Sequence, residues 1–91
     1  MDIEFTTRIF KEGPTFVAQA LELDVSSCGA TKSKALADLK EAVTLFMEEA
    51  GNMGTLDQIL EEAGYRKSRQ KIASPKFISV QRVTLPCSAE L

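Results

Sequence analysis

Few residues in this chain can carry acid–base or metal chemistry, because its 91 residues include no histidine. Without an imidazole there is no Ser-His or Cys-His couple, no side chain that ordinarily titrates near neutral pH, and no histidine-based zinc site. The two cysteines, Cys28 and Cys87, cannot form a Cys₄ site within one chain and belong to no short-spaced motif. We expect both to be reduced thiols, and we expect no cofactor.

Carboxylates near the expected strands are the remaining candidates for catalysis. Clustered Asp and Glu side chains can hold Mg²⁺ or Mn²⁺ for phosphodiester cleavage. The acids placed for this are Asp2, Glu4, Glu22 and Asp24. No motif ties them together, and Glu4 points away from the Ile3–Phe5 side of its predicted strand. We therefore predict that the protein is not an enzyme and has no catalytic or metal-binding residue, with a weak metal-dependent nuclease as the lesser alternative.

Charge is divided between two neighbouring segments, although the net charge is only −2. Residues 37–62 carry a local charge of −6, from Asp38, Glu41, Glu48, Glu49, Asp57, Glu61 and Glu62 against Lys40. Residues 63–82 carry +6, from Arg66, Lys67, Arg69, Lys71, Lys76 and Arg82. The near-neutral total thus conceals an acidic segment followed by a basic one.

The first third of the chain predicts three strands. Residues 2–10 alternate with a period of two, which is typical of a half-buried strand. Gly13 and Pro14 then mark a turn, so residues 15–21 form the second strand of a hairpin. A shorter third strand is expected around 25–29, where Gly29 would permit an unusual backbone before a helix.

Two helices and a last strand complete the predicted elements. Thr31 is a candidate N-cap for a helix that runs to Ala50 and ends at Gly51. Thr55 begins a capping box for a second helix that Gly64 closes. Residues 66–76 read as a loop, and residues 77–85 as the last strand. The order β-β-β-α-α-β predicts a single α+β domain over residues 1–91, an antiparallel sheet of three to four strands with helices on one face.

One face of the first predicted helix has the composition of a contact surface. Asp38, Glu41, Leu45 and Glu48 lie opposite its apolar stripe, so that Leu45 is surrounded by carboxylates. An apolar residue with an acidic rim suits a basic partner, and we take these four as candidate partner-binding residues. The alternative is an ordinary solvated helix face.

The basic segment also has two interpretations. Arg66, Lys67, Arg69 and Lys71 are candidate nucleic-acid contacts, which makes a nucleic-acid-binding regulator the alternative function. The segment lacks interleaved aromatic residues and can equally be a solvated connection, with Tyr65 packed beneath the second helix.

Residues 13–42 resemble the HicB-like antitoxin family. The pattern is a glycine, an aromatic-Val-Ala strand, a Gly-x-Thr step and a helix with Leu-x-Glu-Ala. The matching positions are Gly13, Phe16, Val17, Ala18, Leu23, Gly29, Thr31, Ala35, Leu39, Glu41 and Ala42. One departure is Lys34, where the family often has a glutamate that completes a capping box.

This resemblance implies a partial, degenerate RNase H-like fold without that fold's metal carboxylates. It also implies an antitoxin that neutralises a small basic HicA-like, mRNA-cleaving toxin by masking its active site. Many family members add a C-terminal DNA-binding domain; we expect none here and hence no direct DNA binding. We further expect a cytoplasmic protein with no membrane association. Its small core and final edge strand predict a homodimer or homotetramer.

Overall fold

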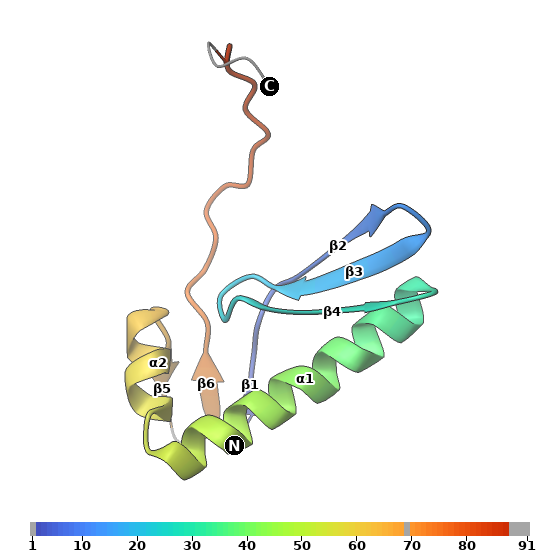
Figure 1. The fold of residues 1–91 in the computed structure, drawn as a ribbon. Coiled ribbons are helices and arrows are strands. Elements are labelled where there is room, and N and C mark those ends of the chain that lie inside the picture. The colour runs from blue at the N-terminus through green and yellow to red at the C-terminus, as the bar shows by residue number, and fades with distance from the viewer. Residues whose placement is uncertain (1, 69, 88–91) are drawn as a thin grey trace.

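A three-stranded antiparallel sheet forms the larger half of the fold. The computed structural model describes residues 2–68 and 70–87 (Figure 1). Strands β2 (Thr7–Glu12), β3 (Thr15–Ala20) and β4 (Val25–Gly29) lie in the order β2-β3-β4. Glu12 pairs with Thr15 across the first turn, where Gly13 adopts a positive φ of 61°. The predicted hairpin and third strand are therefore confirmed.

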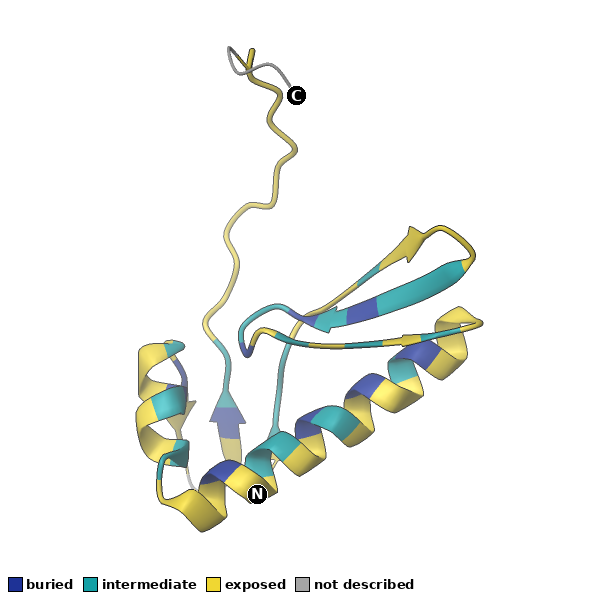
Figure 2. Cartoon of the chain, in the orientation of Figure 1, coloured by how far each residue is buried: buried dark blue, intermediate teal, exposed yellow. Residues whose placement is uncertain are grey.

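Helix α1 (Lys32–Met53) covers one face of this sheet. The hydroxyl of Thr31 accepts a hydrogen bond from the backbone N–H of Lys34 at 3.1 Å, which confirms the predicted N-cap. The buried side of α1 turns toward the strands, and its outer side is exposed (Figure 2). Ala18, Ala20 and Ala35 are each 0% exposed, so small side chains bring helix and sheet together.

Gly29 is needed for this close approach, and not for the unusual backbone that we expected. Its φ is not positive, unlike those of Gly13, Gly54 and Gly64. A Cβ at position 29 would lie 2.7 Å from the backbone nitrogen of Ala35. The constraint is therefore steric and comes from the first turn of α1.

The junction between the helices differs from the prediction in two ways. Gly51 lies inside α1, and the helix ends at Gly54, which takes the left-handed conformation at φ 74° and donates its N–H to the carbonyls of Ala50 and Gly51. Helix α2 (Leu56–Glu62) begins after Thr55, whose side chain makes no cap hydrogen bond. The Thr55 hydroxyl instead donates to the Ala50 carbonyl at 3.5 Å, so the predicted capping box does not form.

A second, mixed sheet joins β-strands that lie before the first sheet and after the helices in the sequence. Strand β1 (Asp2–Ile3) pairs in parallel with β6 (Lys71–Ala73), and β5 (Arg66–Lys67) pairs antiparallel with β6. The predicted strand 2–10 is thus divided between two sheets, and the basic segment predicted as a loop contributes two short strands. The α+β class is confirmed, whereas the single sheet is wrong.

The predicted last strand over 77–85 is also wrong. After β6 the described chain runs on without helix or strand, and residues 76–87 are exposed (Figures 1 and 2). Apolar and β-branched residues give a segment the capacity to form a strand, but they do not determine whether it pairs with the edge of a sheet. This extension accounts for a radius of gyration of 15.7 Å, compared with about 12 Å for a compact domain of this length.

Candidate functional site

The outer face of α1 carries all four candidate partner-binding residues. Asp38, Glu41, Leu45 and Glu48 are exposed, and Leu45 retains 57% of its accessible surface. They lie opposite the buried residues Ala35, Leu39, Val43 and Ala50. The structure therefore brings the four together along one solvent-facing side of a 22-residue helix.

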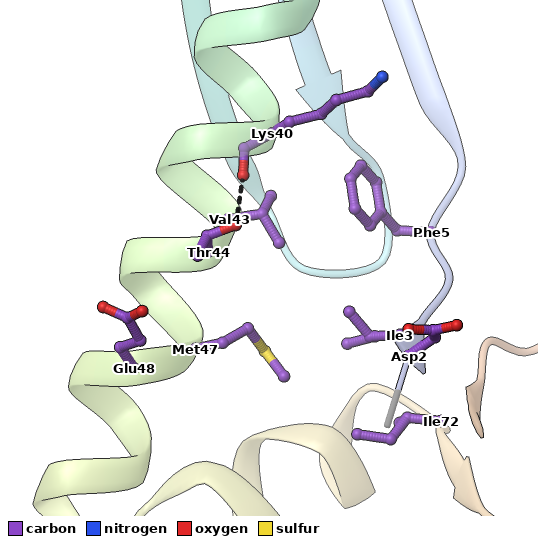
Figure 3. A pocket seen from close by; sticks show the side chains of 9 residues that line it. All are labelled: Asp2, Ile3, Phe5, Lys40, Val43, Thr44, Met47, Glu48 and Ile72. Atoms are coloured by element: carbon purple, nitrogen blue, oxygen red, sulfur yellow. Dashed lines mark hydrogen bonds between the residues drawn. The ribbon is translucent and has the colours of Figure 1, made fainter. Parts of the chain in front are cut away.

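An apolar hollow that sequence reasoning missed opens beside this face. It has a volume of about 660 Å³ and lies between α1 and the mixed sheet. Ile3 and Phe5 face Val43 and Met47 across it, with Ile72 at one end (Figure 3). Lys40, Thr44 and Glu48 of α1 also line it, so the hollow and the acidic face share Glu48. Its lining comes from three segments far apart in sequence, which no periodic pattern could connect.

Glu4, one of the candidate metal carboxylates, holds the mixed sheet together. Its carboxylate pairs with the ammonium group of Lys71 and accepts the backbone N–H of Ser74 at 3.2 Å. The hydrogen bond from Lys71 lowers the pKa of Glu4, and the Ser74 N–H acts in the same direction. This carboxylate is thereby occupied by contacts from β6 and the residue that follows it.

Glu22 and Asp24, two further candidate metal carboxylates, lie in a hydrogen-bonded contact and in a turn. The Glu22 carboxylate accepts the backbone N–H of Thr6 at 2.8 Å and the Thr6 hydroxyl at 2.9 Å. Asp24 occupies the turn before β4 with a positive φ of 54°. Within residues 2–68 and 70–87, no three Asp, Glu or Cys side chains are grouped as a metal site would require.

The basic segment is partly neutralised by the chain itself. Lys67 pairs with Asp57 of α2, and Lys71 pairs with Glu4. Arg66 is exposed on β5, and Arg69 lies outside the described residues. Two of the four candidate nucleic-acid contacts are therefore in ion pairs at the protein surface.

Tyr65 packs in the core, as predicted. It is 8% exposed, and its hydroxyl donates a 2.8 Å hydrogen bond to the backbone carbonyl of Glu4. Burial raises the pKa of Tyr65 to about 12, with further contributions from the negative charges of Glu22 and Glu4. The ring and hydroxyl are thus used in packing, and neither is presented to a nucleic-acid base.

Comparisons with known proteins identify no relative of this chain. Neither a scan against family models nor searches of curated proteins and solved structures found a match for this chain. Within the described part of the chain, neither helix has the length and apolar character that crossing a bilayer requires.

Proposed function

We propose that this protein is a non-catalytic, antitoxin-like binding module that masks the active site of a small basic RNA-cleaving protein. The observation that carries the proposal is the outer face of α1, where carboxylates surround an exposed leucine on a long, packed helix. The likeness of residues 13–42 to HicB-like antitoxins supports it. On this proposal the α+β fold is a partial RNase H-like one, and the protein acts in the cytoplasm.

A surface of this kind can recognise a basic protein through two contributions. Asp38, Glu41 and Glu48 supply negative potential that accelerates encounter with a positively charged partner and sets its orientation. Leu45 and the neighbouring hollow supply apolar area that the partner can cover. Because α1 is capped and packed along its length, little conformational entropy is lost when the face is bound.

The positions of Glu4 and Glu22 favour masking over catalysis. Metal-dependent cleavage needs several carboxylates free to converge on an ion. Here Glu4 is bonded to Lys71 and Glu22 to Thr6. In the same way, the ion pairs of Lys67 and Lys71 reduce the positive charge that a nucleic-acid-binding regulator would use.

A charge-reversal experiment tests the binding face. Asp38→Lys with Glu41→Lys should weaken binding to a co-purifying basic protein by about tenfold or more, and should abolish rescue of growth when the two are co-expressed. The matched control is Glu61→Lys with Glu62→Lys, which makes the same charge change on α2. Binding should also weaken as salt rises. Equal binding by both double variants would refute the proposal that the outer face of α1 binds the basic protein.

The alternative function has its own test. A regulator that binds through the basic segment would show salt-dependent affinity for RNA or DNA, lowered by Arg66→Ala. Such binding by the purified protein, together with failure to capture any basic partner, would favour that alternative over the masking proposal.

A further inference from the structure

Residues 77–85, here called the tail, expose a row of large apolar side chains. Ile78 is 101% exposed, and Val80, Val83 and Leu85 are 80, 72 and 77% exposed; Phe77 retains 48%. The tail is extended, rich in β-branched residues and without proline or acidic side chains. These are the properties of a strand, yet no backbone hydrogen bond among the described residues joins it to a sheet.

Strand β2 is the complementary feature. It is an outer strand in the order β2-β3-β4, so one side of its backbone has no strand neighbour in the described chain. The tail runs past it without packing against it. Val80, Gln81 and Arg82 line one side of a hollow of about 710 Å³, and Arg8, Ile9 and Phe10 line the other. The tail then continues away from the sheet (Figure 1).

Closure of the tail onto β2 of the same chain meets a specific obstacle. The hollow between them is lined by both Arg8 and Arg82, whose like charges would approach each other as it closed. Arg8 is already engaged on its own sheet, where it bonds to Gln19 and lies 5.5 Å from the centre of the Phe10 ring. When the tail pairs with β2 of a separate molecule, the chain connection does not determine which residues lie opposite each other. The guanidinium groups of Arg8 and Arg82 then need not approach each other.

We propose that the tail pairs as an added strand with β2 of a second copy of this chain, and that the second copy returns the same contact. A reciprocal exchange of this kind is closed and two-fold symmetric, and it pairs both tails and both β2 edges without any further component. The tail is long enough, because nine residues of strand span about 30 Å and β2 has only six residues.

The area that one face of the tails offers is comparable with a small specific interface. In an extended strand Phe77, Val83 and Leu85 lie on one face and Ile78 and Val80 on the other. An apolar side chain of this size covers on the order of 60–120 Å² when buried, so the four to six on one face of two tails would remove roughly 240–720 Å² from water. With a similar area covered on the strands that receive them, the total is roughly 480–1,440 Å², which at its upper end reaches the range of specific interfaces.

Sedimentation of the full-length chain tests the dimer and the part that the tail plays in it. The 10.0 kDa chain should sediment at twice its mass at micromolar concentration. Ile78→Asp with Val80→Asp should weaken dimerisation by about 100-fold or more while leaving the circular dichroism of the fold unchanged, because both side chains are already exposed in the single chain. The control is Met53→Asp, an exposed apolar residue at the last position of α1, which should remain dimeric. A wild-type monomer, or a dimer that persists in the tail variant, would overturn the proposal.

Cross-linking between differently labelled chains tests the docking site. In a Cys28→Ser, Cys87→Ser background, chains with Phe10→Cys are mixed with chains carrying a cysteine at position 78, 80 or 83. Oxidation should give a disulfide-linked dimer for at least one position. The absence of a cross-link at all three, or efficient bonding only within chains that carry both cysteines, would place the tail elsewhere and refute the exchange. Neither assay involves the outer face of α1, so their results are independent of the masking proposal.

Discussion

The roles of individual residues follow from what each side chain contacts. Glu4 and Glu22 have the residue type of a metal ligand, but their oxygens accept hydrogen bonds from the chain's own backbone. Gly29 has the residue type of a flexible turn, but it is required by the nearby nitrogen of Ala35. In both cases the residue type indicates which chemistry is available, whereas the group that the residue contacts belongs to a distant segment or to a packed helix.

Tyr65 offers a sharp test at this scale, because it is the only tyrosine in a chain without tryptophan. Its absorbance change on ionisation should have a midpoint near pH 12 in the folded protein, against the ordinary pKa of 10.0. The folded protein holds the Tyr65 hydroxyl in its neutral form, because its pKa is raised. The contribution of this group to the free energy of unfolding is therefore fully present below about pH 10 and is lost as the pH rises toward 12. A midpoint near 10 in the folded state would contradict the buried position of the hydroxyl.

Replacing Tyr65 by phenylalanine separates its hydrogen bond from its packing. Tyr65→Phe should lower the free energy of unfolding by about 1 kcal/mol at neutral pH, because the Glu4 carbonyl loses its donor. The variant should also lose less stability than the wild type between pH 10 and 12. Urea titrations at both pH values measure the two effects, and an unchanged stability at neutral pH would show that the bond contributes nothing.

The elements that sequence predicted well are those determined by local patterns. The hairpin and α1 arise from alternation, a turn glycine and a threonine cap, all within a few residues. The short strands β5 and β6 escaped prediction because their residues are mostly polar, and because β6 also pairs with β1, about 70 residues away. The tail was predicted as a strand because composition reports the capacity to pair and cannot show whether the segment does pair within its own chain.

The candidate site, too, could be predicted from the sequence only in part. The exposed face of α1 could be predicted, because a helical period places Asp38, Glu41, Leu45 and Glu48 together. The hollow beside it could not, because its walls come from α1, the first residues of the chain and β6. Binding at either place stays a prediction until a partner is found.

Two glycines near the C-terminal end of α1 test where that helix ends. Gly51→Ala should stabilise the protein by about 0.5–1 kcal/mol, because position 51 is helical and its Cβ would meet only Leu56 Cδ2 at 4.0 Å. Gly54→Ala should destabilise it by about 1–2 kcal/mol, because position 54 has a positive φ. Chemical unfolding of both variants compares them directly, and changes of the same sign would show that the helix ends elsewhere.

At the scale of the whole molecule, the exposed tail links stability to concentration. If two chains exchange tails, the folded dimer is favoured by mass action, and the thermal midpoint should rise by a few degrees for each tenfold increase in protein concentration. The Ile78→Asp, Val80→Asp variant should show a midpoint that does not depend on concentration. Differential scanning calorimetry over two decades of concentration measures both, and a constant wild-type midpoint would contradict the exchange.

The parallel pairing of β1 with β6 sets an order for folding during synthesis. The β2-β3-β4 sheet and α1 are contiguous in sequence and can assemble as soon as they leave the ribosome. Asp2 and Ile3 must wait for Lys71 and Ile72, so the hollow between α1 and the mixed sheet closes on one side only after β6 has been synthesised. The tail emerges after that. A chain interrupted before residue 71 would therefore display the acidic helix face without the mixed sheet beside it.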